Sequence, residues 1–338
     1  MKTRAAFVLA WALAPILAAG ALESCGARTG LTFVEAEDAG EDVPFVQDRF
    51  VPVEEDAMPM IDAFKNDVPV INPCPDAAAT LIYVIGQSNT LYSFNPAAGT
   101  STSIAKIDCP GTDRNITPFS MAVDREGIAY VIFAEEVDGG QDQIEKATGL
   151  YRVSTKTAEC ERTAYSPEQN DNETFGMGFV ANVGSDGGDA GETLFVSQDT
   201  NNDVNSNGLL GAIDTESFIL TNVGPFGPSV PSAELTGTGD GRLFAFSPAQ
   251  QGMGESFIAQ IDPTNAKVIG EDPLPGIFQG AGWAFGFWGG DFYTFTSTGQ
   301  TGPTDVNRFD PHDMSIKKVA SIPDSIVGAG VSTCAPQN

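Results

Sequence analysis

The chain has 338 residues, with 45 Asp and Glu against 17 Lys and Arg, a formal net charge of −28 and a single histidine, His312. This charge excludes a basic surface for nucleic acid, and one histidine excludes a metal centre or an acid–base pair built from two histidines. Hydrophobic residues make up 41% of the chain and include 22 Phe, which is enough apolar material for a folded core.

The N-terminus has the pattern of an export signal. Lys2 and Arg4 precede an apolar run from residue 5 to residue 19 that only Pro15 interrupts. The run is too short for a stable membrane-spanning helix and has the length of a signal-peptide core. We therefore predict a signal peptide over residues 1–24.

Two cleavage sites compete at its end. Ala19-Gly20-Ala21 fits ordinary signal peptidase, whereas Leu22-Glu23-Ser24-Cys25 resembles a bacterial lipobox, from which Glu23 departs. Five cysteines are an odd number for an exported protein. Lipidation of Cys25 leaves four cysteines for two disulfides, which favours a lipid anchor there and a place in the cell envelope, at the outer membrane or cell surface. A free Cys25 in a disordered tail is the alternative.

The next segment, residues 25–76, is predicted to be a tether. From Val34 to Asp76 it contains 12 acidic residues, two basic residues and several prolines. Such a composition repels itself and buries little surface, so the segment is expected to stay extended, either as a spacer that lifts a domain off the membrane or merely as an acidic leader.

The remainder, residues 77–336, is an internal repeat of short strands between turns. First strands are predicted at 119–123, 175–179, 232–235, 282–287 and 328–331, and second strands at 81–85, 129–133, 193–196, 242–246 and 291–295. Third strands follow at 91–95, 150–154, 210–214, 258–262 and 306–310, and fourth strands include 267–269 and 316–320. The third strands end on turn-capping residues with spacings of 59, 60, 48 and 48, namely Asn95, Ser154, Asp214, Asp262 and Asp310. Five four-stranded units with this period predict an all-β fold, a five-bladed β-propeller.

The two ends of the repeat predict how the ring closes. The first unit lacks a first strand, and residues 328–331 form a first strand with no second strand after them. The C-terminal strand is therefore expected to complete the first blade, and a Cys74–Cys334 disulfide to join the ends of the domain. Cys109 and Cys160 remain as the second pair, although their places in the repeat could put them on opposite faces.

Several segments resemble a group of uncharacterised lipoproteins of myxobacterial type. These are the stretch that begins at Cys25, the acidic tether, and residues 80–84, 234–244, 283–292 and 326–336. The resemblance implies a propeller on a lipid tether and implies no activity.

Three features are candidates for ligand chemistry. Asp199, Asn201 and Asp203 lie in a loop that could hold Ca²⁺ weakly, although Val204 stands where a calcium loop has glycine; a solvated loop is the alternative.

Two acidic residues are candidates for catalysis. Glu234, on a first strand, and Asp124, in a turn, could act as two catalytic carboxylates near the axis, although such residues more often have structural or turn-capping roles. Among the aromatic residues, alternation predicts Trp283, Phe285 and Phe287 in the core and leaves Trp288 as a candidate platform for a sugar. His312 is expected in an exposed turn.

No catalytic triad, phosphate-binding loop or paired-cysteine zinc motif is evident. We therefore expect a non-enzymatic binding or scaffold protein with a membrane contact through its lipid and an unknown protein or glycan ligand. The alternative is a propeller that binds or hydrolyses glycans with axial carboxylates.

Overall fold

The computed structural model describes residues 74, 80–138, 143–171, 173–183, 189–198, 208–227, 230–231, 233–248, 254–299 and 301–338. The predicted signal peptide, Cys25, the tether up to residue 73 and the candidate calcium ligands Asp199, Asn201 and Asp203 lie outside these residues. Within the described part, no helix has both the length and the apolar character needed to cross a membrane.

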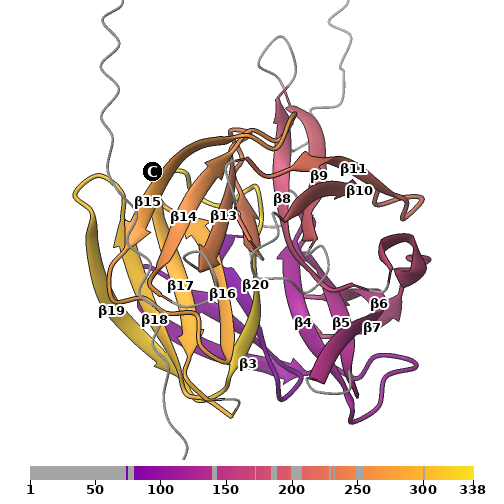
Figure 1. Ribbon diagram of the computed structural model, residues 1–338. Helices are drawn as coiled ribbons and strands as arrows, with labels where there is room; N and C mark the ends of the chain where they lie inside the picture. Colours follow the sequence, from indigo (N-terminus) through magenta and orange to yellow (C-terminus); the bar gives the residue numbers. More distant parts are fainter. Residues whose placement is uncertain are drawn as a thin grey trace, which may run out of the picture. The chain divides into compact units, whose positions relative to one another are not determined.

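Five four-stranded antiparallel sheets form the blades of a β-propeller, which confirms the predicted fold (Figure 1). Blade 1 contains β20 (Ile326–Val331), β1 (Ile82–Gly86), β2 (Thr90–Asn95) and β3 (Thr100–Lys106), and blade 2 contains β4 (Ile116–Val123), β5 (Ile128–Asp138), β6 (Gln143–Ser154) and β7 (Cys160–Arg162). Blade 3 contains β8 (Phe175–Val183), β9 (Asp189–Gln198), β10 (Leu209–Ile213) and β11 (Leu220–Pro225). Blade 4 contains β12 (Glu234–Gly237), β13 (Leu243–Pro248), β14 (Ser256–Ile261) and β15 (Val268–Leu274), and blade 5 contains β16 (Gly282–Trp288), β17 (Asp291–Ser297), β18 (Thr304–Asp310) and β19 (Ser315–Ile322). A short 3-10 helix, η2 (Pro167–Asn170), lies between blades 2 and 3.

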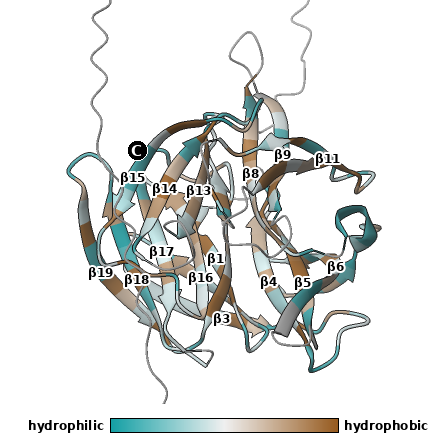
Figure 2. Cartoon of the chain, viewed as in Figure 1, coloured by the Kyte–Doolittle hydropathy of each residue, from teal (hydrophilic) through white to brown (hydrophobic). Residues whose placement is uncertain are grey.

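The hydrophobic core lies between the blades. Five clusters of buried apolar side chains each join residues from two neighbouring blades, such as Phe246 of blade 4 with Phe285 of blade 5. Figure 2 shows apolar residues along strands of every blade, whereas η2 is hydrophilic. Because both faces of a blade are covered by its neighbours, a ring of blades buries the apolar side chains that a single sheet would leave exposed.

The polar residues at the ends of the third strands cap the turns that follow, as the repeat predicts. The side-chain oxygen at the end of each third strand accepts a hydrogen bond from a backbone N–H two or three residues later, at Asn95, Ser154, Asp214, Asp262 and Asp310. These side chains hold the tight turn into the fourth strand, which explains why polar residues mark the period of the sequence. His312 lies exposed in the last of these turns.

The C-terminal strand closes the ring. Strand β20 pairs antiparallel with β1, with Val331 opposite Ile82 and Gly328 opposite Ile85. Cys74 and Cys334 are joined by a disulfide with their Cα atoms 5.5 Å apart, as the strand register predicts.

Cys109 and Cys160 form the second disulfide, with a Cα separation of 5.1 Å. The possibility that they lie on opposite faces is therefore wrong. The chain after β3 turns back between blades 1 and 2, where Cys109 is buried in the cluster that Cys160 borders.

Candidate functional site

The axis of the propeller is closed by direct contact between inner strands. Each of β4, β8, β12, β16 and β20 touches its two neighbours in the ring. A Cβ atom at Gly176 of β8 would overlap the carbonyl oxygen of Ala233, and one at Gly328 of β20 would lie 2.8 Å from the backbone nitrogen of Met121. Glycine therefore lets the backbones meet, and side chains that reach a ligand along the axis must lie where the inner strands begin or end.

One end of the axis contains a cavity. We call this end the pocket face; it is where the inner strands begin, at Thr117, Glu234, Gly282 and Val327. An inner chamber of about 90 Å³ is lined by Gln87, Thr117, Pro118, Phe119, Glu145, Glu234, Ala281, Gly282, Trp283 and Val327. A β-bulge in β4 between Pro118 and Ser120 interrupts the strand register beside this chamber, and such bulges change the direction in which side chains point.

Glu234 is the buried carboxyl group of the inner chamber. It is the first residue of β12 and only 3% exposed. Ser120 Oγ donates a hydrogen bond of 2.7 Å to its Oε2 atom, and the N–H of Met177 donates a second bond to the carboxylate. Burial raises the pKa of Glu234 well above its usual value, and the two hydrogen bonds offset this only in part. Glu234 can therefore retain a proton at a pH where an exposed glutamate has lost it.

A larger outer chamber adjoins the inner one. It has a volume of about 590 Å³ and is lined by Gln87, Arg114, Asn115, Thr117, Glu135, Glu136 and Glu145. Gln87, Thr117 and Glu145 line both chambers, so the two are adjacent, and we call them together the depression. Pockets for small ligands typically have volumes of about 300 to 1,000 Å³, and the polar lining of this one suits a ligand rich in hydrogen-bonding groups.

Two glutamates face each other at the rim of the depression. Glu136 on β5 is directly opposite Glu145 on β6 in the hairpin. Loss of hydration and the charge of Glu136 raise the pKa of Glu145, although its side chain keeps surface in solvent. The sequence-based strand begins only at residue 150, whereas β6 begins at Gln143. The expected strand was too short, and these two glutamates were missed.

The predicted catalytic pair Glu234 and Asp124 is split between the two ends of the axis. Ser120, which contacts Glu234, lies four residues before Asp124 along β4 and the turn that follows it. At about 3.3 Å per residue this places Asp124 roughly 13 Å further along the axis. The structure instead brings Glu145 to the chamber of Glu234.

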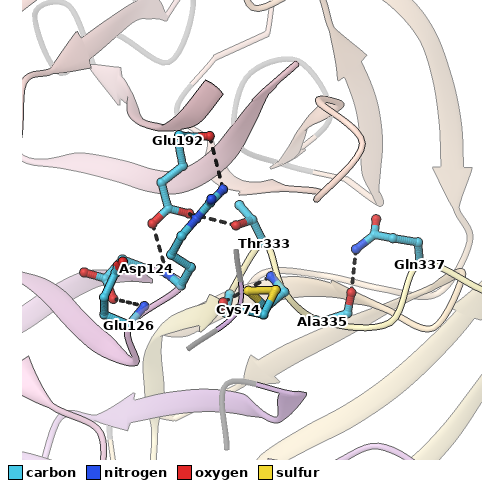
Figure 3. Close-up of a disulfide and its surroundings, with 11 residues drawn as sticks. Cys74, Asp124, Glu126, Glu192, Thr333, Ala335 and Gln337 are labelled. Atoms are coloured by element: carbon cyan, nitrogen blue, oxygen red, sulfur yellow. Dashed lines mark hydrogen bonds and ion pairs between the residues drawn. A yellow bond between two sulfur atoms is a disulfide. The ribbon is translucent and has the colours of Figure 1, made fainter. Parts of the chain in front are cut away.

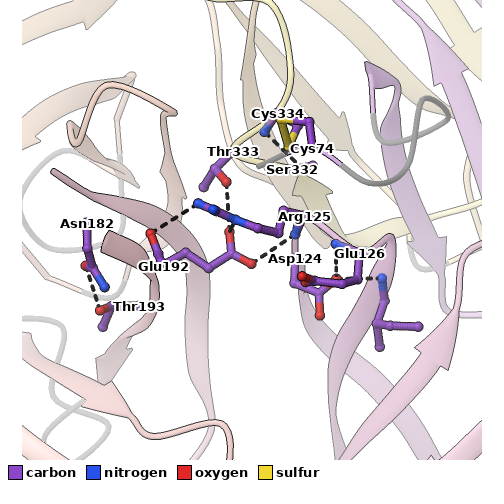
Figure 4. A network of polar contacts seen from close by, with 12 residues as sticks. Cys74, Asp124, Arg125, Glu126, Asn182, Glu192, Thr193, Ser332, Thr333 and Cys334 are labelled. Atoms are coloured by element: carbon purple, nitrogen blue, oxygen red, sulfur yellow. Dashed lines mark hydrogen bonds and ion pairs between the residues drawn. A yellow bond between two sulfur atoms is a disulfide. The ribbon is translucent and has the colours of Figure 1, made fainter. Parts of the chain in front are cut away.

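Asp124 belongs to a cluster at the opposite end, which we call the seam face because the ring closes there at Cys74 and Cys334. Asp124, Glu126 and Glu192 each offer a carboxylate oxygen within 4.8 Å of the others, a grouping that could hold a metal ion (Figure 4). Burial, with smaller contributions from the negative charges of Glu192 and Glu126, raises the pKa of Asp124 to about 7. Hydrogen bonds from the N–H groups of Ile128 and Glu126 lower this pKa and so offset part of the increase.

Glu192 connects three blades at the seam face. Its carboxylate accepts hydrogen bonds from the backbone N–H of Arg125, at 2.9 Å, and from Thr333 Oγ1, at 2.8 Å. Arg125 Nε lies 3.6 Å from the same carboxylate. Thr333 directly precedes Cys334 of the seam disulfide, and Figure 3 shows Thr333 close to this disulfide, at Cys74. The cluster therefore has a structural role at the closure of the ring, and Arg125 already supplies it with a positive charge.

The tryptophans differ in part from the prediction. Trp283 is half-buried and packs edge-on against Phe246 at the border of the core, on the side that alternation predicts, but it also lines the inner chamber, whereas Phe285 and Phe287 are fully buried as expected. Trp288 lies at the seam end of β16, half-buried, and its Nε1 atom donates a hydrogen bond of 2.5 Å to the carbonyl oxygen of Thr80. Of the two, Trp283 is the one beside a cavity.

Comparison with known proteins gives only distant likenesses. No protein-family profile and no curated protein sequence matches the chain. Among solved structures, a chain of a nidogen/laminin complex is 9% identical with a TM-score of 0.43, over 74% of this chain and 97% of its own. An exo-β-1,3-galactanase from Phanerochaete chrysosporium is 10% identical with a TM-score of 0.41, over 60% and 53%. The GH43_1 enzyme from Xanthomonas citri in complex with xylose is 12% identical with a TM-score of 0.41, over 60% and 72%. None of these likenesses assigns an activity to this chain.

Proposed function

We propose that the protein is exported to the cell envelope, anchored by a lipid on Cys25, and that its propeller is a non-enzymatic binding module. The signal-like N-terminus, the lipobox, the acidic tether and the resemblance to lipoproteins of myxobacterial type support export and anchoring. Two disulfides among the described residues are typical of an extracellular or oxidising environment. Mass spectrometry of the mature N-terminus tests the anchor: we expect an acylated Cys25, and an unmodified chain beginning at Leu22 contradicts it.

The observation that carries the binding function is the two-chamber depression at the pocket face. The inner strands close the rest of the axis, so this depression is where a ligand can reach side chains from several blades at once. Trp283 provides an aromatic wall, and Gln87, Asn115 and Glu145 provide donors and acceptors. A saccharide fits this combination, because one face of a sugar packs on an aromatic ring while its hydroxyl groups form hydrogen bonds with polar side chains.

A glycan array with the mature domain tests this function, followed by calorimetric titration of each hit. We expect Trp283→Ala to abolish binding and Trp288→Ala, the matched change at the seam face, to preserve it. Thermal unfolding of both variants establishes that each is folded. Binding that survives Trp283→Ala contradicts a site at the pocket face, and the absence of any glycan hit contradicts the saccharide as ligand.

Glycan hydrolysis is the second candidate, and one observation favours it. Glu234 and Glu145 line the same chamber and both have raised pKa values, whereas glycosidases need one carboxylic acid that gives a proton and one carboxylate that acts as a base or nucleophile. Incubation of each glycan hit with the domain, with detection of new reducing ends, tests it. Activity that Glu234→Gln abolishes and Glu271→Gln preserves supports hydrolysis, whereas unchanged glycans leave the binding module as the function.

A further inference from the structure

The depression at the pocket face has an excess of unpaired negative charge. The residues that line it include four glutamates, Glu135, Glu136, Glu145 and Glu234, and one residue with a cationic side chain, Arg114. Among the residues that the structure describes, Glu136 and Glu145 have no ion-pair partner, although they are directly opposite each other across β5 and β6. Like charges in such a position destabilise a hairpin. A positively charged group that binds between the two carboxylates therefore stabilises the hairpin.

The arrangement of these carboxylates disfavours a metal ion as that group. Ca²⁺ takes six to eight oxygen ligands at about 2.3 to 2.6 Å, which requires carboxylates that converge on one point. Within the described residues, the group of three or more carboxylates whose oxygens all lie within 4.8 Å of one another is that of Asp124, Glu126 and Glu192, at the seam face. The pocket-face glutamates are instead spread over two chambers, an arrangement that suits an extended organic ligand.

An ammonium group matches the depression in several respects. It carries one positive charge and three hydrogen-bond donors, and its bonds to carboxylates are stronger than neutral ones. Trp283 lines the inner chamber, and the indole ring of tryptophan attracts cations. The net charge of −28 also draws cations to the protein and repels anions.

We propose that the ligand of the pocket face presents a primary ammonium group, which binds at the rim between the carboxylates of Glu136 and Glu145 while the rest of the ligand extends towards Trp283. This inference rests on the proposed binding function and narrows its ligand. An oligosaccharide with free amino groups and a polyamine share this chemistry.

Three probes distinguish the sources in calorimetric titrations of the mature domain. They are a glucosamine tetramer, which has both sugar rings and amino groups; an N-acetylglucosamine tetramer, which has the rings but no charge; and spermidine, which has the amino groups alone. We expect the glucosamine tetramer to bind at least about tenfold more tightly than its acetylated counterpart. Spermidine that binds as tightly as the glucosamine tetramer identifies a polyamine as the source, and weaker spermidine binding identifies the amino sugar.

Variants locate the ammonium group. Glu136→Gln and Glu145→Gln are each expected to weaken binding of the glucosamine tetramer or spermidine about tenfold, since a hydrogen bond to a charged group is lost. The matched control is Glu271→Gln, which removes the same charge from an exposed position on β15, and it is expected to leave the affinity unchanged. All three positions are on the surface of strands, so the variants are expected to fold.

Two results overturn the inference. Equal binding of the acetylated and free-amine tetramers shows a saccharide site that ignores the ammonium group, which leaves the proposed binding function in place. Failure of all three probes overturns the ammonium ligand, and the glycan array then decides separately whether the proposed function fails with it.

Discussion

The two ends of the propeller axis both gather carboxylates, but they surround them differently. At the seam face, Glu192 accepts bonds from Arg125 and Thr333, and Asp124 accepts two backbone N–H groups. At the pocket face, Glu136 and Glu145 have no partner among the described side chains, and buried Glu234 has one side-chain donor, Ser120. The same residue type therefore has hydrogen-bond and ion-pair partners at the seam face, where it connects the blades, and lines a cavity at the pocket face.

The seam disulfide gives the largest expected effect. The double variant Cys74→Ser/Cys334→Ser removes a link with a sequence separation of 260, and we expect the free energy of unfolding to fall by about 4 to 5 kcal/mol. Urea unfolding measures it.

The other disulfide is the control for this prediction. Cys109→Ser/Cys160→Ser opens a separation of 51, for which loop-closure entropy predicts a loss about 1.4 kcal/mol smaller. A seam variant as stable as the wild type would show that strand pairing between β20 and β1 holds the ring alone.

The protonation of Asp124 gives the second effect. Its pKa is raised from 3.8 to about 7 in the folded protein, so the folded state holds this proton more tightly than the unfolded chain does. Its stabilisation is therefore present at acidic pH and is lost as the pH rises from about 4 to about 7, by up to about 1.4 kcal/mol per pH unit.

Urea unfolding between pH 4.5 and 7.5 measures this dependence, with Asp124→Asn as the comparison. Asparagine keeps an oxygen that can accept from the N–H groups of Glu126 and Ile128, but it cannot titrate. The slope is expected to be shallower in this variant, and identical slopes would mean that another group causes it.

The fold could be predicted because it depends on local chemistry that repeats. Polar residues that cap turns recur at the end of each third strand, as at Asp262 and Asp310, and the missing strand of the first blade pointed to its closure by residues 328–331. From that register the Cys74–Cys334 pair follows, since both cysteines are adjacent in chain order to strands that pair.

The pocket could not be predicted to the same extent, because it depends on tertiary register. Glu145 lies in a polar stretch with no strand-like alternation, and it meets Glu136 only through the register of a long hairpin with a bulge after Phe133. Alternation placed Trp283 on the core face with Phe285, but it did not show that Trp283, near the start of β16, lies beside the inner chamber. The sequence predicted that Glu234 and Asp124 lie near the axis, but only the structure shows at which end of the axis each of them lies.

The positive charge of Arg125 gives the third effect. Arg125→Met leaves three carboxylates at the seam face without their cation, and we expect a loss of about 2 kcal/mol in unfolding free energy at pH 7. The loss is expected to shrink at pH 5, where Asp124 is protonated. A loss that is the same at both pH values would show that Arg125 contributes by packing rather than by charge.

The hydrogen bond between Ser120 and Glu234 gives the smallest effect, and it tests the pocket-face half of the comparison. Ser120→Ala removes the only side-chain donor to Glu234 among the described residues, and a bond of this kind contributes about 1 kcal/mol. Because this bond lowers the pKa of Glu234, its removal raises that pKa further and leaves the group neutral over a wider pH range.

A double-mutant cycle with Glu234→Gln, measured by urea unfolding, isolates the coupling between the two side chains. We expect a coupling of about 1 kcal/mol where Glu234 is ionised and a smaller one where it is protonated, since the bond is weaker to a neutral carboxyl group than to a carboxylate; a series of pH values follows the change. A coupling that does not change with pH would mean that Glu234 keeps one protonation state throughout, and the pocket face would then lack a group that can exchange a proton with a ligand.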